Sequence, residues 1–431
     1  MTGKRRGNLP VPLKIARAQM GELWRIVTIQ PKPPARLLAR VGRWTVAVAI
    51  REFAWQLSIL GLVALVVLAL ASGLDSGPAK LGFAVIAALS ANELRLALAS
   101  KRSAAEVERA LAGLELEEGP RMSRAMIAFP LLMLFPRNIA HDRAVAYHRD
   151  STGTLRLDVY RPAGRRLTEG PRPAVIQVHG GGWIVGSRLE QGIPLLNHLA
   201  SCGWVGFNID YRLSPQASWP DHIVDVKRAI AWVRENHERF GIDPERVCLT
   251  GGSAGGHLTA LAGLTENDPA FQPGFEDSDT SLSVVVPFYG VYDLTDADRI
   301  YWPAFNDWIL EKLLFKVRRE ADPERFRAAS PRFRVHSGAP PFLVIHGDRD
   351  TLVPVADART FAGSLEAVSH NPVRYIELPG AEHAFDLLPS LRTARTVEGI
   401  ERFLRATLAA RTGVQAPSPA EIDRPRQLVG I

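Results

Sequence analysis

Cysteine is scarce in this sequence. Only Cys202 and Cys248 occur among 431 residues, and both fall in or beside apolar runs. So few cysteines exclude a disulfide-stapled scaffold, and we expect two buried thiols; the alternative is one disulfide, if the fold brings the two cysteines together. The patterns H-E-x-x-H and G-K-S/T are also missing, so the sequence supports neither a metal site nor a phosphate loop. We therefore expect no cofactor.

Acidic residues are nearly absent from the N-terminal segment 1–52. Eleven of the first 51 residues are Lys or Arg, and Glu22 is the one acid among them. Because the whole chain has a formal net charge of +7, the remainder is acidic on balance. No nucleic-acid recognition motif accompanies the basic segment, so we expect no nucleic-acid partner.

Charge disappears entirely from Phe53 to Leu74. About 20 apolar residues are enough for a helix to cross the hydrocarbon of a bilayer. A second apolar run, 81–89, follows a short turn and can extend to about Ser100. The region 53–100 is therefore predicted to form one or two transmembrane helices, with membrane lipid as partner. The alternatives are a soluble core helix, or one span followed by an amphipathic helix.

The number of spans decides on which side of the membrane the rest of the chain lies. Basic flanks stay cytoplasmic, so we expect the N-terminus inside. One span would place the remainder outside, whereas two would return it to the cytoplasm, and we favour two. The apolar run begins too deep in the chain for a cleaved signal peptide. Segment 101–140 is predicted to be a linker, with the apolar stretch 125–135 as a cap or an interfacial anchor.

Strand-like and helical patterns alternate from about residue 154 onward. This alternation predicts an α/β domain over 141–412, with a mostly parallel sheet covered on both faces. The final segment, 413–431, is rich in proline and charge and is predicted to be disordered.

The pentapeptide Gly251–Gly255 has the form G-x-S-x-G. It follows the apolar run Val247–Leu249 and precedes a helical pattern that begins near His257. A strand that breaks into a glycine-flanked serine and then a helix is typical of a nucleophile elbow. We therefore predict Ser253 as a nucleophile, against the alternative of a plain glycine-rich turn.

Candidates for the other catalytic groups follow in chain order. The apolar run 342–347 leads into a turn that carries Asp348 and Asp350, and an aspartate there can hold an imidazole in one tautomer. Asp350 is our choice, because Asp348 is better placed to cap the turn through its own backbone. His383 lies on a loop after the alternating run 373–378 and is the candidate general base.

Upstream of the serine, a predicted strand at 174–178 ends in His179-Gly180-Gly181-Gly182-Trp183. Glycines at a strand end let backbone N–H groups approach a ligand closely, as in the oxyanion holes of esterases, where the residue after the nucleophile, here Ala254, is a second donor. The alternative is a flexible loop. We expect His179 to fix this loop by hydrogen bonding, and Asp210 and Arg212 to pair beneath it.

Residues from about 140 to 410 resemble an α/β-hydrolase, specifically the hormone-sensitive-lipase-like esterases. The matching segments, in the order of the family, are LDVYRP (157–162), HGGGW (179–183), DYRLSP (210–215), GGSAGG (251–256), HGDRD (346–350) and AEHAF (381–385). The resemblance implies an ester hydrolase with a Ser253–His383–Asp350 triad. It also implies that Gly180, Gly181 and Ala254 donate to the oxyanion, and that the substrate is a small ester or a lipid.

Two positions depart from this pattern or widen it. Many members carry an acid immediately before the serine, whereas this chain has Gly252. Trp183 resembles the pattern of kynurenine formamidases, so an amidase with the same triad is the alternative activity. We expect Trp183, Gly252, the stretch 125–135 and the insertion 294–331 to shape the substrate pocket. A non-catalytic, membrane-tethered interaction domain is the third hypothesis, since a fold alone does not fix function.

Overall fold

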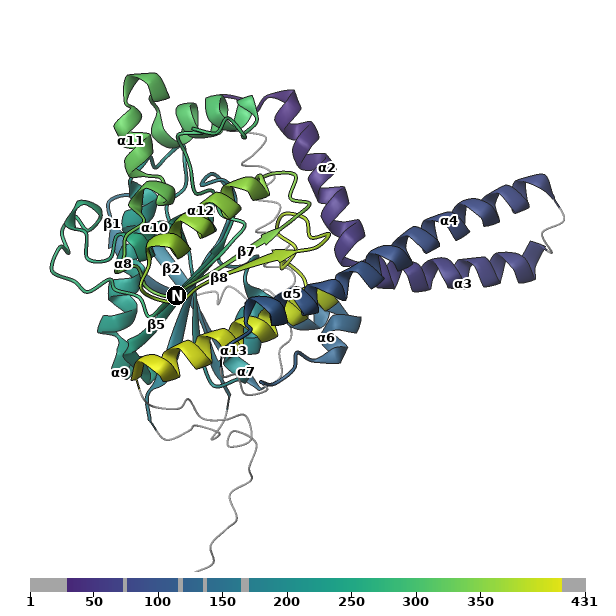
Figure 1. Cartoon of the computed structure of the whole chain (residues 1–431), viewed down its shortest axis with the longest axis horizontal. Helices are drawn as coiled ribbons and strands as arrows, with labels where there is room; N and C mark the ends of the chain where they lie inside the picture. Colours follow the sequence, from purple (N-terminus) through teal and green to yellow (C-terminus); the bar gives the residue numbers. More distant parts are fainter. Residues whose placement is uncertain (1–28, 73–75, 115–118, 135–137, 164–169, 413–431) are drawn as a thin grey trace, which may run out of the picture.

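The structure is a computed structural model that describes residues 29–72, 76–114, 119–134, 138–163 and 170–412. Its centre is one eight-stranded sheet in the order β1-β2-β4-β3-β5-β6-β7-β8 (Figure 1). The strands are β1 (Ile139–Asp150), β2 (Gly153–Pro162), β3 (Arg172–Val178), β4 (Val205–Ile209), β5 (Ile242–Gly252), β6 (Val284–Phe288), β7 (Phe342–Gly347) and β8 (Val373–Leu378). Pairing is antiparallel from β1 through β2 to β4 and parallel across all the others. The prediction of a mostly parallel sheet is confirmed.

Helices cover both faces of the sheet. They are α2 (Ala35–Glu52), α3 (Ala54–Ser72), α4 (Gly77–Ser100), α5 (Arg102–Ala110), α6 (Arg124–Ala128), α7 (Ile193–Ser201), α8 (Asp221–Glu235), α9 (His237–Phe240), α10 (Ala254–Leu264), α11 (Pro323–Ala328), α12 (Val355–Val368) and α13 (Leu391–Thr412). Shorter 3-10 turns are η1 (Pro130–Leu134), η2 (Pro269–Phe271), η4 (Arg319–Ala321) and η5 (Pro331–Arg334), and η3 (Phe305–Phe315) is a π-helix.

Two apolar cores lie between the sheet and its helices. One contains side chains of α8, α10 and α12, and the other contains side chains of α5, α7 and α13. β3 is buried at every residue, as expected for a central parallel strand with helices on both sides. Cys202 and Cys248 are free and buried in the second core, so the expectation of two buried thiols is confirmed.

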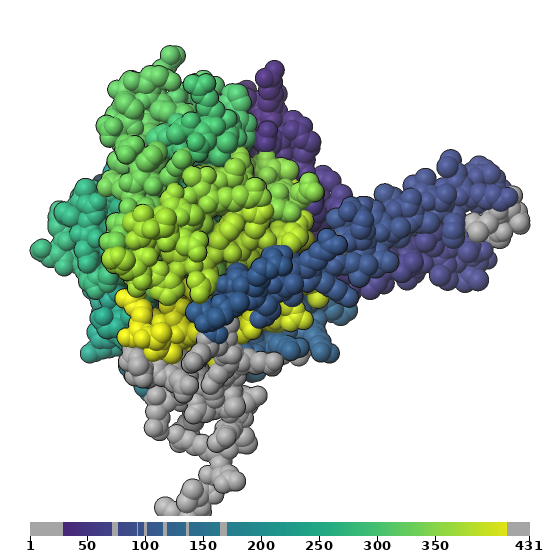
Figure 2. All heavy atoms as spheres, viewed as in Figure 1, coloured from purple at the N-terminus to yellow at the C-terminus, as the bar shows by residue number. Residues whose placement is uncertain are grey.

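Helices α3 and α4 form a hairpin that projects from the body (Figures 1 and 2). Small side chains let the two helices approach closely: Ser58 Oγ donates to the Ser90 carbonyl over 3.2 Å, and a Cβ added at Gly61 would lie 2.0 Å from Ser90 Oγ. Most large apolar side chains of the hairpin are exposed, among them Val63 and Val67. The hairpin therefore has an apolar surface that no other described part of the chain covers.

By length and composition, one continuous helix, Gly77–Ala110, could cross a membrane. The pair Ala35–Glu52 and Ala54–Leu70 passes the same test together, but it is bent by 74°. The predicted turn between the two runs falls partly outside the described residues, as do segment 1–28 and the tail 413–431.

Within the stretch 125–135, residues 125–128 belong to α6 and residues 130–134 form η1, with the break at Phe129, and Phe135 lies outside the described residues. It sits beside the hairpin, because Gln56 Nε2 of α3 donates to the Ile127 carbonyl over 3.4 Å. Phe129 and Leu131 are exposed. This stretch therefore adds apolar surface at the base of the hairpin.

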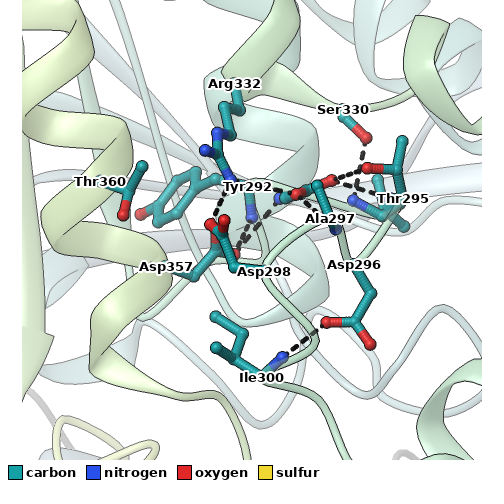
Figure 3. Close-up of polar contacts among 12 residues, drawn as sticks. Tyr292, Thr295, Asp296, Ala297, Asp298, Ile300, Ser330, Arg332, Asp357 and Thr360 are labelled. Carbon is teal, nitrogen blue, oxygen red and sulfur yellow. Dashed lines mark hydrogen bonds and ion pairs between the residues drawn. The ribbon is translucent and has the colours of Figure 1, made fainter.

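The insertion 294–331 is tied to α12 through Asp357, which is buried (Figure 3). One oxygen of Asp357 accepts from the Tyr292 N–H over 2.6 Å and from the Tyr301 hydroxyl over 2.5 Å. Burial raises the pKa of Asp357 to about 6, although these hydrogen bonds oppose the shift. Ser330 Oγ accepts from the Leu294 N–H over 2.9 Å, and Arg332 pairs with Asp293 over 3.2 Å. Side-chain hydrogen bonds thus fix both the start and the end of the insertion.

Helix α5 attaches the C-terminal end of α4, the second helix of the hairpin, to the body. Val107 and Leu111 are buried against α13, where Gly399 makes room for them: a Cβ at Gly399 would lie 2.3 Å from Val107 Cγ1. Gly399 is therefore required by close packing of two helices.

We expect Gly399→Ala to lower the free energy of unfolding by about 1–3 kcal/mol, because the added methyl overpacks the contact with α5. Gly363→Ala is the matched control, since an added Cβ on this exposed face of α12 meets nothing within 4 Å. That control should raise stability by about 0.5–1 kcal/mol. Thermal unfolding of both variants in detergent measures the difference, and equal melting temperatures would contradict the packing argument.

Candidate active site

Ser253 stands at the sharp turn between β5 and α10. Its backbone has φ 58° and ψ −121°, a conformation that is strained for a residue with a side chain. Glycine is required on both sides, because a Cβ at Gly251 would lie 2.7 Å from the Val178 carbonyl oxygen and a Cβ at Gly255 would lie 2.2 Å from it. The Ser253 N–H donates to the Phe288 carbonyl over 3.0 Å, which fixes the turn against β6. The side chain is partly exposed.

Asp350 and His383 are brought together by the loops after β7 and β8. The Asp350 Oδ2 lies 2.6 Å from His383 Nδ1 and 3.1 Å from His346 Nε2. Its Oδ1 accepts from the N–H groups of Leu352 over 2.8 Å and Val353 over 2.7 Å. Burial alone raises the pKa of Asp350, but the charges and hydrogen bonds of His383 and His346 outweigh it and hold the pKa well below its usual range. The carboxylate is therefore ionised at neutral pH.

The second aspartate of this turn has a different task. Asp348 Oδ1 accepts from the Gly380 N–H over 2.6 Å and so clamps the two loops together. Glu382 adds a second clamp, because its Oε1 accepts from the N–H groups of Thr351 over 2.7 Å and His383 over 3.0 Å. The structure thus brings Asp350, and not Asp348, to the imidazole. The sequence did not indicate the roles of Glu382 and His346.

Tyr289 lies between His383 and the loop that carries Ser253. Its ring centroid is 4.6 Å from that of His383, and a Cβ at Gly252 would lie 2.6 Å from its hydroxyl oxygen. The hydroxyl donates to Asp386, whose pKa is raised by burial. This packing explains Gly252: the space that an acidic side chain would take is filled by Tyr289. Because Tyr289 touches both loops, Ser253 and His383 lie at one site.

The glycine loop runs over the serine. A Cβ at Gly180 would lie 3.0 Å from Ser253 Cβ, which places the loop where an oxyanion would form. The Gly180 N–H, however, donates to Gln191 Oε1 over 2.7 Å, so the structure engages one predicted oxyanion donor with a side chain. Gly181 has φ 113°, and within the described residues its N–H has no acceptor. Ala254 is the first residue of α10, where helix N–H groups lack intrahelical partners.

The structure corrects one expectation for this loop and agrees with another. Trp183 is fully buried and its indole N–H donates to His257 Nδ1 over 3.2 Å, so it supports the loop and presents no surface to a substrate. His179 does fix the loop, with Nδ1 2.8 Å from the Gly180 carbonyl oxygen.

Asp210 and Arg212 do not pair with each other. Asp210 pairs with Arg188, while Arg212 Nε and Nη2 each lie 2.8 Å from Asp225, which is buried on α8. Each of the two side chains pairs with a residue of another segment, so the sequence around positions 210–212 does not indicate the partner.

Comparisons with known proteins agree with this geometry. The BD-FAE family model matches residues 157–365. The chain is 46% identical over 292 residues to the probable carboxylic ester hydrolase LipM of Mycobacterium tuberculosis, covering 68% of this chain and 67% of LipM. It is 45% identical over 268 residues to esterase LipQ of the same organism, covering 61% of this chain and 62% of LipQ.

Among solved structures, the butyrate-bound esterase Est2 of Thermogutta terrifontis superposes with a TM-score of 0.53 at 25% identity. The match covers 65% of this chain and 97% of Est2. Residues 29–138, with α2 and the hairpin, lie outside the family match. The site combines a glycine-flanked serine at a strand-to-helix turn with a buried carboxylate–imidazole pair. Together with these relatives, it shows that the chain belongs to the α/β-hydrolase esterases and is a carboxylic ester hydrolase.

Proposed function

We propose that this protein is a membrane-anchored serine carboxylesterase that works through an acyl-enzyme on Ser253. The observation that supports this most is the Asp350–His383 pair, 2.6 Å apart and buried, beside a serine in a strained turn. A serine hydroxyl is a weak nucleophile at neutral pH and needs an oriented base. Asp350 fixes Nδ1 as the protonated nitrogen of His383, which leaves Nε2 free to accept a proton.

Hydrolysis then takes two steps. Ser253 Oγ attacks the ester carbonyl as His383 Nε2 takes its proton, and the imidazolium returns that proton to the departing alcohol. Water, deprotonated by the same nitrogen, attacks the acyl-enzyme, and the proton goes back to Ser253 as the acid leaves. The negative charge of Asp350 stabilises the imidazolium in both steps.

The tetrahedral oxyanion of each step needs N–H donors. Gly181 and Ala254 are the donors that this arrangement favours, because their N–H groups have no acceptor among the described residues and Ala254 opens α10. Gly180 joins them only if its N–H leaves Gln191. Each such donor is worth roughly 10²–10³ in kcat.

The exposed apolar hairpin supports anchoring to a membrane. At 1.5 Å per residue α3 is about 28 Å long and α4 about 36 Å, against about 30 Å of bilayer hydrocarbon. The close approach at Gly61 and Ser90 is of the small-residue type that pairs helices in lipid. The exposed Phe129 and Leu131 extend this surface at the base of the hairpin.

Both ends of the hairpin return to the catalytic domain, α2 on one side and α5 on the other. A hairpin that crosses twice therefore puts the N-terminal segment and the catalytic domain on one side. The excess of Lys and Arg in residues 1–51 favours the cytoplasmic side.

We expect Ser253→Ala to lower kcat for p-nitrophenyl butyrate by roughly 10⁶-fold, because the nucleophile is removed. It should also abolish labelling by a fluorophosphonate probe. Ser364→Ala is the matched control, since Ser364 lies on α12 and bonds only to the Thr360 carbonyl. Unchanged turnover in Ser253→Ala refutes the assignment. Faster turnover of N-formylkynurenine than of short acyl esters favours the amidase alternative instead.

Replacing the two aspartates of the loop after β7 one at a time distinguishes the orientation of His383 from the hydrogen bond that joins the two loops. Asp350→Asn should lower kcat by about 10⁴-fold, because the amide cannot hold the productive tautomer of His383 or balance the imidazolium. Asp348→Asn keeps an oxygen that accepts from the Gly380 N–H, so its loss should be far smaller. Steady-state kinetics of the two variants test this, and a larger loss in Asp348→Asn would reverse the two roles.

Charge on the outer face of α3 should release the protein from membranes. The double variant Val63→Arg/Val67→Arg places two cations where each costs about 2.5–3.5 kcal/mol in a bilayer. Val368→Arg, at an exposed valine of α12, is the control. Flotation with phosphatidylcholine vesicles measures binding: the wild type and the control should float, and the double variant should not. A wild type that stays unbound would remove the anchor from the proposal.

A further inference from the structure

Helix α2 touches both catalytic loops (Figure 1). Arg40 Nη1 donates to the Thr351 carbonyl over 2.7 Å, next to Asp350, and Arg51 Nη1 donates to the Gly380 carbonyl over 3.1 Å. The helix runs along the side of the body at which β7 and β8 end. Residues more than 300 positions away in the sequence therefore complete the surroundings of the acid and the base.

Trp44 makes the most direct of these contacts. Its indole N–H donates to the carbonyl of His383 itself over 2.8 Å, and its ring stands edge-on to the imidazole, with centroids 6.4 Å apart. Asp350 holds the imidazole and Glu382 holds the His383 N–H, so Trp44 holds the second backbone polar group of this residue, its carbonyl. A change at Trp44 thus acts on the placement of His383 without touching a reacting atom.

The C-terminal end of α2 is fixed where the chain turns into the hairpin. Glu52 is buried, forms an ion pair with Arg392 and accepts from Ser390 Oγ over 2.6 Å. Directly after it the chain bends by 74° into α3. If α3 follows the membrane normal, α2 lies close to the membrane plane.

The side of α2 that faces away from the body suits that position. Leu38, Val46 and Ile50 are 48%, 59% and 37% exposed, and their spacing of eight and four residues places them on one stripe of the helix. Arg36 and Arg43 are exposed as well. An apolar stripe with basic side chains is typical of a helix that lies in the interface of a lipid bilayer.

We propose that α2 is an interfacial helix that links the seating of the protein on a lipid bilayer to its catalytic base, with Trp44 as a positioning residue for His383. This rests on the proposed membrane-anchored esterase and adds where the active site faces. The loops that carry Asp350 and His383 lie directly beneath the helix that meets the lipid, so an ester dissolved in the bilayer reaches the site from that side.

The first test uses Trp44→Phe in the full-length protein, in vesicles of phosphatidylcholine with phosphatidylglycerol. The ring is kept and the N–H is lost, so kcat for p-nitrophenyl butyrate should fall roughly 10- to 100-fold at unchanged KM, because a small displacement of a base is costly. Trp232→Phe is the matched control: Trp232 lies on α8 and packs on Phe240, with ring centroids 5.8 Å apart, so the same exchange is made away from both loops. The control should keep kcat within about two-fold.

A Trp44→Phe protein with the kcat of the control overturns the positioning role, and so does an effect confined to the melting temperature. Failure of the underlying function looks different, because the wild type itself would then show no fluorophosphonate label on Ser253.

The second test is Val46→Asp/Ile50→Asp, which leaves Trp44 in place. We expect kcat in detergent to match the wild type, while the vesicle-to-detergent ratio of kcat falls below that of the wild type by about three-fold or more. A ratio equal to the wild type overturns the interfacial role of α2.

Discussion

The buried carboxylate of Asp350 is the constraint on which the site depends. An unpaired charge in this position would be very costly, and the fold meets that cost with N–H donors from His346, Leu352, Val353 and His383. Because these donors come from two loops, satisfying one charge fixes the geometry of both. The loops after β7 and β8 are therefore held as one unit by the carboxylate that contacts His383.

Steric crowding fixes the position of Ser253, just as the charge of Asp350 fixes the position of His383. Gly251 and Gly255 lie against the Val178 carbonyl, and Gly252 lies against Tyr289. The strain at Ser253 persists because these close contacts and the hydrogen bond to Phe288 leave the turn no alternative path. Tyr289 then joins the two halves, since it packs on the imidazole and fills the space beside the serine.

Much of this could be predicted from the sequence because the signals are local. G-x-S-x-G after a strand, three glycines after β3, and Asp350 and His383 after strand ends are all patterns of a few neighbouring residues. What escaped prediction depends on partners that lie far apart in the chain. Gln191 on the Gly180 N–H, Arg188 between Asp158 and Asp210, and Trp44 on the His383 carbonyl leave no motif. For the same reason the sequence indicated only that α2 belongs to a basic N-terminal segment, although its inner face contacts the loops that carry Asp350 and His383.

The attachment of α2 has a consequence for how the protein is made. The partners of Trp44, Arg51 and Glu52 lie 339, 329 and 340 residues further along the chain. At 5–20 residues per second, a ribosome needs roughly 15–70 seconds to reach them after α2 has emerged. During that interval α2 has no catalytic domain to pack on, so Trp44, Arg51 and Glu52 wait for these partners. The contacts that join α2 to the loops after β7 and β8 and to α13 are thus among the last of the described fold to form.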